Sequence, residues 1–325
     1  MPFMSHRDER LSARIIKSTP LLYDDGPDPT LDRPAHVRAA SSLVWLGQSL
    51  LIFQDDARWV GVLGWPGGRV EALALDRGAD GKRIHDAARG TKAWKLDLEA
   101  ATPWREGEVE GVLAFGSGST SQRETVVWID LSGNVQEMPA PDWYRILREN
   151  NSFAGSELNL EGVMNLGDGH IRLLQRGNGA PRDGLHPQNA FADVDGASLM
   201  SYLRGGGPPP PLFNIHPCDL GQMDNVPLTF PDGCVAGGRL FYISAAEASP
   251  DTYHDGEVVG AAVGIFSGGG GRWTPLLESD GKPSVKKIEG VAPYPGRRDR
   301  LWMVVDADDG DKPAELMEVE LGGPW

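Results

Sequence analysis

A short sequence pattern recurs five times along the chain, and it constrains the fold more than any other feature. In the clearest copies an acidic residue is followed by a small residue, an apolar stretch, a turn and a strongly apolar strand. These copies begin at Glu99, Glu161 and Glu289, and weaker copies begin at Ser41 and Asp232. Successive copies are 58, 62, 71 and 57 residues apart. A period of about sixty residues that opens on strand–turn–strand is typical of a propeller or a solenoid.

Each unit has room for four short strands, which is the content of a propeller blade. The predicted strands of the first unit are SLVWL, SLLIF, WVGVL and RVEALAL, and those of the second are EAATPW, GVLAF, TVVWIDL and NVQEMPA. Three units have a glycine six residues after the repeated position, at Gly47, Gly167 and Gly238, where we expect a turn. Helical spacing predicts short helices over residues 142–150 and 197–203.

The last unit contains only three predicted strands, KIEGVAP, RLWMVV and ELMEVEL. The missing outer strand is predicted at the other end of the chain, where residues 13–23 read ARIIKSTPLLY. Pairing the two ends hides a strand edge that would otherwise be exposed. We therefore expect an all-β, five-bladed β-propeller, one domain over residues 1–325, closed by this N-terminal strand. Two β domains that meet near residues 205–211 are the alternative, although the period continues across that run.

Composition and charge limit the partners of the chain. Its 325 residues include 42 glycines and 25 prolines, a turn-rich composition that disfavours a helical protein. The formal charge of −15, from 31 basic and 46 acidic residues, argues against binding to nucleic acid or to an anionic membrane. Cys218 and Cys234 lack metal-site spacing and are predicted to be buried thiols. Residues 1–15 are polar and no run of eighteen apolar residues occurs, so we expect a cytoplasmic protein.

The repeated position predicts a metal site. The first strand of every propeller blade lines the central channel, so the five repeated residues should face one another. This predicted ring consists of Ser41, Glu99, Glu161, Asp232 and Glu289. Four carboxylates this close cannot all stay ionised unless a cation or protons balance them. A hard cation with oxygen ligands, Ca²⁺ first and Mg²⁺ or Mn²⁺ as the alternative, fits such a ring. The other interpretation is structural: these acids cap strand ends or accept hydrogen bonds from backbone amides.

The chain resembles a bacterial domain family of unknown function over nearly its whole length. The resemblance is carried by the stretches KLDLEA, AFGSGSTSQRE, PLTFPDG, SPDTYHDGEVVGAAVGIF and KIEGV. More distantly, it is similar to the phytase-like esterase propellers and to the calcium-activated nucleotidase (apyrase) propellers. The apyrase resemblance implies five blades around a calcium ion held at Ser41, Glu99, Glu161 and Glu289. Asp232 stands where that family has a serine, and the nucleotide-binding loops of that family have no counterpart here.

Two functions remain open. In the first, the protein is a metal-dependent hydrolase of a phosphoester, ester or lactone, with Asp55 and Asp306 as candidate general bases at the ends of second strands. Lys92, Lys95 and Arg176 would bind a small anionic substrate. His186 and Asn189 lie in a polar loop, and the histidine could transfer protons there. In the second, the protein is a scaffold whose central cation only rigidifies the fold and whose rim binds a protein or carbohydrate. No protein partner is identified by the sequence.

Overall fold

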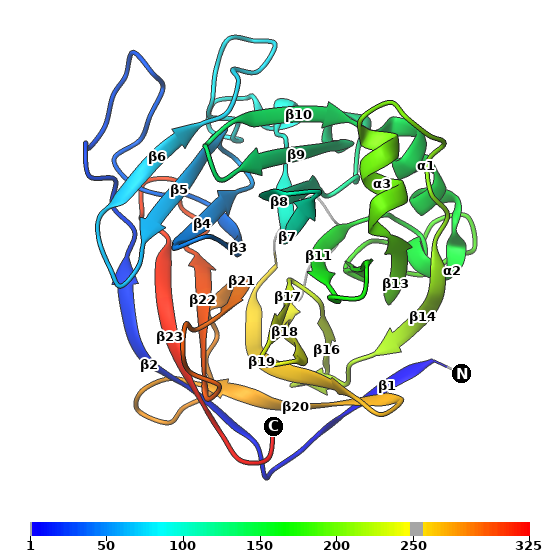
Figure 1. The fold of residues 1–325 in the computed structure, drawn as a ribbon. Coiled ribbons are helices and arrows are strands. Elements are labelled where there is room, and N and C mark those ends of the chain that lie inside the picture. Colours follow the sequence, from blue (N-terminus) through cyan, green and yellow to red (C-terminus); the bar gives the residue numbers. More distant parts are fainter. Residues whose placement is uncertain (1, 248–255) are drawn as a thin grey trace.

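The computed structural model describes residues 2–247 and 256–325, and within them the fold is all-β with a few short helices. Figure 1 shows the sheets arranged around a common centre. Two sheets are separate and antiparallel, each with four strands in chain order. The first contains β3(Ala40–Leu46), β4(Ser49–Gln54), β5(Trp59–Gly64) and β6(Val70–Ala74). The second contains β7(Leu98–Glu106), β8(Val109–Gly116), β9(Thr125–Asp130) and β10(Val135–Pro139).

The remaining strands form one sheet of fifteen strands, within which three antiparallel runs can be followed. The first run is β11(Leu160–Asn165), β12(His170–Gln175), β13(Asn189–Asp195) and β14(Phe213–Asp219). The second is β17(Gly233–Ala236), β18(Arg239–Glu247), β19(Val258–Ser267) and β20(Gly270–Leu277), with β15(Gln222–Met223) and β16(Val226–Thr229) beside it. The third is β21(Lys287–Pro293), β22(Arg300–Asp306), β23(Glu315–Gly322) and β2(Ser12–Pro20).

Two N-terminal strands join these three runs. β2 pairs antiparallel with β23, which is the pairing that the sequence predicts for the missing outer strand, and its start also pairs parallel with β20. β1(Phe3–Arg7) pairs parallel with both β14 and β20. The first twenty residues therefore cover the outer edges of all three runs, and these edges would otherwise offer unpaired backbone groups to other chains. The contacts of β1 and of β2 with β20 were not predicted from the sequence.

The hydrophobic core lies between neighbouring sheets. In β4, Leu50 and Ile52 belong to the cluster shared with the last run, whereas Leu51 and Phe53 belong to the cluster shared with the second sheet. Side chains alternate between the two faces of a strand, so a strand buried on both faces reads as a continuous apolar run. This arrangement explains the unbroken SLLIF segment. The predicted turn residues Gly47, Gly167 and Gly238 have φ values of 58°, 83° and 77°.

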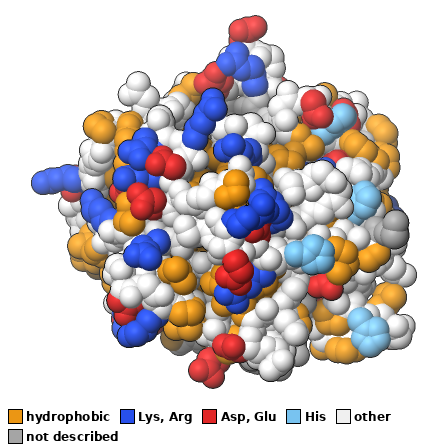
Figure 2. Space-filling view, turned by 90° about the horizontal axis from the view of Figure 1, so that it is seen from below, with side chains coloured by type: hydrophobic (Ala, Val, Ile, Leu, Met, Phe, Trp, Pro, Cys, Tyr) orange, Lys and Arg blue, Asp and Glu red, His pale blue; other side chains and the backbone are white. Residues whose placement is uncertain are grey.

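Both predicted helices are present, as α1(Pro141–Glu149) and α3(Gly196–Leu203), with a short α2(Asn151–Ala154) after the first. Trp143, Tyr144 and Leu147 of α1 are fully buried in the cluster between the second sheet and the β11–β14 run. Among the described residues, no helix has the length and apolar character needed to cross a membrane. Basic and acidic side chains are intermixed on the side of the molecule seen from below Figure 1 (Figure 2).

Removing residues 2–20 should leave β14, β20 and β23 with unpaired edges, since β1 and β2 cover all three. We expect the truncated chain to form oligomers or aggregates in size-exclusion chromatography and to melt at a lower temperature. Ile16→Lys is a suitable control, because this residue of β2 is 38% exposed and its substitution keeps the strand pairing. A truncated chain that stays monomeric with an unchanged melting temperature would contradict this role.

Candidate functional site

Four innermost strands carry a β-bulge at the repeated position. The register with the second strand shifts between Ala40 and Ser42, Leu98 and Ala100, Leu160 and Gly162, and Ile288 and Gly290. The residue inside each bulge has no partner in the ladder, and it is Ser41, Glu99, Glu161 or Glu289. A bulge re-aims the side chain that it carries. All four residues line one cavity, so the sequence repeat marks a backbone feature as well as a side-chain type.

Asp232 differs from the other members of the predicted ring. It precedes β17 and is not among the residues that line the central cavity. One of its oxygens accepts a hydrogen bond from the Gly233 amide at 2.7 Å, and the other accepts one from the Val291 amide at 3.0 Å. Burial raises its pKa well above the usual range, although these amides oppose the effect. Its contacts match the structural interpretation of the repeat. Ser41 lines the cavity, but its hydroxyl donates to the Leu98 carbonyl at 2.5 Å.

The central cavity contains charges of both signs. Its carboxylates are Asp55, Asp97, Glu99, Glu161, Glu289 and Asp306. Its cationic side chains are Lys92, Lys95, Arg123, Arg176 and Lys287. The sequence predicted Lys92, Lys95 and Arg176 as substrate-binding residues, and the structure places these cations among the carboxylates. Opposite charges within about 4–6 Å of each other favour the ionised form of both partners.

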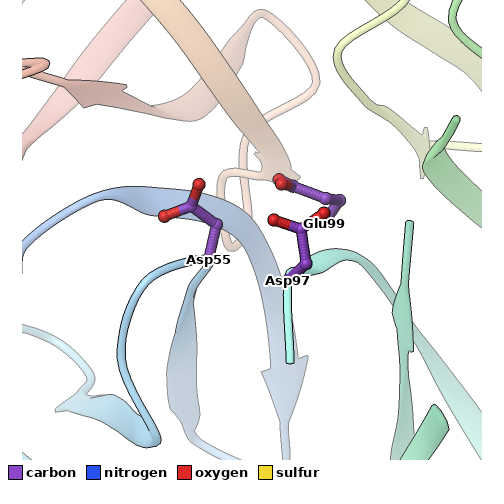
Figure 3. A group of neighbouring side chains, drawn as sticks. All are labelled: Asp55, Asp97 and Glu99. Atoms are coloured by element: carbon purple, nitrogen blue, oxygen red, sulfur yellow. The ribbon is translucent and has the colours of Figure 1, made fainter. Parts of the chain in front are cut away.

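Three carboxylates on one side of the cavity could hold a metal ion. Asp55 follows β4, and Asp97 and Glu99 lie at the start of β7; Figure 3 shows their carboxylates converging. Each offers one oxygen, and these oxygens all lie within 4.8 Å of one another. Asp55 Oδ1 is buried and has no hydrogen-bond partner in the described part of the chain. A buried oxygen without a donor is costly, and a bound cation would satisfy it.

Asp97 is held in a backbone conformation that few residues adopt. Its φ is 55°, in the left-handed region, where aspartate is among the better tolerated residues. Its Oδ2 accepts a hydrogen bond from Ser117 Oγ at 2.5 Å and lies 2.8 Å from an Arg123 guanidinium nitrogen. Burial disfavours its charge, but Lys95, Arg123 and Ser117 outweigh burial and lower its pKa. Asp97 is therefore ionised and fixed in position.

Glu99 lies in the opposite electrostatic environment. Burial, together with the charges of Asp97, Glu161 and Asp55, raises its pKa well above the usual range, and Lys95 opposes this only in part. The Lys95 ammonium pairs with Asp55 and lies 3.1 Å from Asp97 Oδ1. The Lys95 ammonium therefore occupies the position at which a metal ion would bind the same carboxylates.

Arg176 organises the other side of the cavity. It lies 3.5 Å from Glu161 and 3.9 Å from Glu289, and it pairs with Glu247 at the end of β18. Asn159 donates to Glu161 Oε1 at 2.7 Å. Burial raises the pKa of Glu161 to about 8, because Glu289 and Asp97 add to burial and Arg176 offsets only part of the effect. Of the predicted substrate-binding cations, Lys92, Lys95 and Arg176 all line the cavity.

The two predicted catalytic carboxylates, Asp55 and Asp306, line the same cavity. Asp306 lies at the end of β22, with the Lys287 ammonium 3.7 Å from its Oδ2. Burial raises its pKa well above the usual range; Lys287 lowers it, while Asp55 and Asp308 raise it further. Both carboxylates also border a neighbouring groove between the loop that follows β6 and the loop that follows β22.

His186 and Asn189 are not brought to this cavity. His186 is exposed in the loop before β13. Asn189 is committed to structural hydrogen bonds: its Oδ1 accepts from the Gly177 amide at 3.0 Å, and its Nδ2 donates to the Leu228 carbonyl at 2.9 Å. These bonds hold the polar loop before β13 against a neighbouring run. Asn189 therefore has a structural role, although its polar surroundings in the sequence suggested a binding site.

Asp97, Asn159 and Lys287 belong to the cavity and were missing from the predicted site. Each of them precedes a bulge residue by two positions. The residue type changes from unit to unit, so a search for a repeated residue passes over it. The constant spacing to the bulge residue was the available signal.

Comparison with known proteins places the chain in a family. Residues 36–321 match the model of a family of unknown function (DUF6929). The chain belongs to this family. The family match confirms the resemblance to a domain family of unknown function, while the phytase-like and apyrase resemblances are not shown. No match was found among curated proteins.

Similarity to solved structures is distant. A putative glycoside hydrolase from Bacteroides ovatus shares 10% identity, covers 92% of this chain and 96% of its own, and has a TM-score of 0.44. The PQQ-bound aldose sugar dehydrogenase from Streptomyces coelicolor shares 12% identity over 97% of this chain and 99% of its own, with a TM-score of 0.41. A putative gluconolactonase shares 13% identity over 99% and 96%, with a TM-score of 0.39.

Lys95→Met should strongly destabilise the protein. It removes the ammonium between Asp55 and Asp97 and leaves buried charge without its partner, so we expect the free energy of unfolding to fall by about 3–5 kcal/mol in metal-free buffer. Urea unfolding measures the change. Lys312→Met is the matched control, because the Lys312 side chain is 68% exposed and its pair with Asp309 is at the surface. Equal, small effects of the two substitutions would show that Lys95 does not stabilise the cavity.

Glu161→Gln should change how stability depends on pH. The carboxyl of Glu161 has a pKa of about 8 in the folded chain and about 4.3 when unfolded. Between these values the folded state binds more protons, so the wild type loses stability as pH rises, by at most about 1.4 kcal/mol per pH unit from this group. Unfolding at pH 5.5, 6.5 and 7.5 should show a smaller loss in Glu161→Gln, while Glu149→Gln, at an exposed residue, should follow the wild type. Parallel curves for all three proteins would contradict the raised pKa.

Proposed function

We propose that the five antiparallel runs of four strands are the blades of a five-bladed β-propeller, and that the cavity on its axis binds a divalent cation. We further propose that the protein is a cytoplasmic, metal-dependent hydrolase of a small anionic phosphoester, ester or lactone, and that it binds neither nucleic acid nor membrane. The observation that carries the proposal is the convergence of Asp55, Asp97 and Glu99 on one space.

The residues suit a hard cation. Oxygens that lie within 4.8 Å of one another can all bind one Ca²⁺ ion, because Ca–O distances of about 2.3–2.6 Å allow ligands up to about 5 Å apart. Mg²⁺, with bonds of about 2.0–2.1 Å, would require oxygens no more than about 4.2 Å apart. Ca²⁺ is therefore the first candidate, with Mg²⁺ or Mn²⁺ as the alternative. Asp55 Oδ1 would gain the partner that it lacks among the described residues.

The surrounding side chains could serve hydrolysis. A bound cation would polarise a carbonyl or phosphoryl oxygen. Asp306 has a raised pKa, as a group that exchanges a proton with water near neutral pH requires. Asp55, the second predicted base, shares the cavity with it, but as a ligand of the cation it would not be free to take a proton. Lys92 and Arg176, which also line the cavity, would stabilise negative charge on the substrate.

The alternative function is a scaffold. It is favoured by the ion pairs of Lys95 with Asp55 and Asp97, and by those of Arg176 with Glu161 and Glu289. In that case the side chains of the chain itself neutralise the central carboxylates, any cation only rigidifies the fold, and the rim binds a protein or a carbohydrate.

Cation binding tests the metal site that the hydrolase requires. We expect Ca²⁺ to raise the melting temperature of chelator-treated protein, because an ion that binds only the native state stabilises it. Glu99→Gln should weaken Ca²⁺ binding at least about tenfold in calorimetric titrations, since it removes one charged ligand. Glu149→Gln, at an exposed residue of α1, should bind Ca²⁺ as the wild type does. Melting curves that coincide with and without Ca²⁺, Mg²⁺ and Mn²⁺ would contradict the metal site.

Activity is tested on protein with cation bound. Phosphomonoesters, phosphodiesters, aryl esters and lactones form the substrate panel. We expect turnover of one class that is lost in Glu99→Gln and falls at least about tenfold in Asp306→Asn, the typical effect of losing a general acid or base being larger still. Binding of the cation without turnover of any class would favour the scaffold.

A further inference from the structure

A second pocket lies at the opposite end of the strands that form the central cavity. β3 begins at the central cavity with Ala40 and Ser41, and four residues later Trp45 lines this second pocket. The pocket lies between the first sheet and the β21–β23 run, two parts that are neighbours in Figure 1. Its wall also includes the segment that follows β2 and the connection from β5 to β6.

Four half-buried aromatic side chains line this pocket: Trp45, Trp65, Tyr294 and Trp302. Tyr294 and Trp302 are stacked, with centroids 4.9 Å apart and planes 22° apart. Trp65 is nearly perpendicular to Trp45, at 87°, and to Tyr294, at 83°. The indole nitrogen of Trp302 is buried and has no acceptor among the described residues. The pocket therefore offers large aromatic surfaces, which are common in ligand sites.

The polar residues of the pocket carry both signs of charge. Lys17 and Arg69 are basic, and Asp24 and Glu318 are acidic. Arg69 lies 3.0 Å from Asp24, and its side chain is 78% exposed. Because two positive groups balance two negative ones, the rim does not select a strongly charged ligand. It offers donors and acceptors around an aromatic floor.

We propose that this pocket binds a neutral carbohydrate, one pyranose ring lying against Trp65 and its hydroxyls reaching the charged rim. A sugar ring has an apolar face of C–H groups that packs on an aromatic plane. Each of its hydroxyls both donates and accepts, so one ligand can bond to both Arg69 and Asp24. This site is separate from the proposed cation site and does not depend on it.

Other occupants fit the rim less well. A proline-rich peptide would pack on the aromatic rings, but its proline carbonyls only accept hydrogen bonds. Asp24, whose side chain is 30% exposed, would then lose water without gaining a donor from the peptide, which is unfavourable. A quaternary ammonium ligand would suit the rings and the carboxylates, but it would bring a positive charge beside Lys17 and Arg69.

The test is calorimetric titration of the full chain with methyl pyranosides of glucose, galactose, mannose and N-acetylglucosamine, together with tryptophan fluorescence. We expect saturable binding of at least one glycoside. Trp65→Ala should weaken this binding at least about tenfold, and Arg69→Ala should weaken it by about three- to tenfold, consistent with loss of one solvent-exposed hydrogen bond of ordinary strength. Arg69 is largely exposed, so its substitution tests the pocket without endangering the fold.

Trp94→Ala is the matched control, because Trp94 is 46% exposed on the short helix η1(Lys92–Trp94), outside this pocket. It should bind the glycoside as the wild type does, and so should Glu99→Gln, which distinguishes this site from the cation site. The proposal is wrong if no glycoside binds saturably, or if Trp65→Ala and Arg69→Ala bind as tightly as Trp94→Ala. Binding of a polyproline peptide or tetramethylammonium at Trp65, without any glycoside, would also overturn it.

Discussion

Mutual neutralisation of buried charge is the condition on which the centre of this molecule depends. Removing a carboxylate from water is unfavourable by several kcal/mol unless an opposite charge and hydrogen bonds replace the water. Here Lys95 and Arg123 compensate Asp97, and Arg176 links the two glutamates at the opposite side. The compensation is uneven, so that Asp97 has a lowered pKa and Glu99, two residues away, a raised one. Neighbouring carboxylates with divergent pKa values are characteristic of functional sites, although structural ion-pair networks also produce them.

The bulges explain how a sheet can present these charges at all. A regular strand alternates its side chains between two faces, and here both faces are filled by apolar clusters. One extra residue in an innermost strand escapes this alternation and turns toward the axis. In each of the four strands with a bulge the unpaired residue lines the cavity, and most of the paired residues build the core. Paired residues at strand ends, such as Lys287, also reach the cavity. The ladder of β17 with β18 has no such bulge, and the Asp232 carboxylate accepts hydrogen bonds from backbone amides and does not line the cavity.

Patterns with a regular period were predictable from the sequence, and contacts between units were not. The apolar strands, both helices and the pairing of β2 with β23 followed from periodicity and from a missing strand. Four of the five repeated residues were correctly placed around one cavity. Asp97 was missed because the units have different residues at its position, and its role depends on a left-handed backbone that no pattern reveals. Arg176 was predicted to bind substrate, but the depth to which its long side chain reaches among the carboxylates is decided by packing. Asn189 was misread because a polar loop residue has the same sequence signature whether it binds a ligand or its own backbone.

The strand β2 has a consequence for how the chain reaches its native state. Ser12 pairs with Gly322, so this ladder joins residues that are about as far apart in sequence as the chain allows. Contacts of such long range require a large loop to close before any hydrogen bond forms, and they slow folding. Sheets whose strands are close together in the sequence can form early, whereas the ladder between β2 and β23 cannot form until the two distant segments have come together. Its loss should accordingly be an early event in unfolding, and the lifetime of the native state, more than its equilibrium stability, should depend on these few residue pairs.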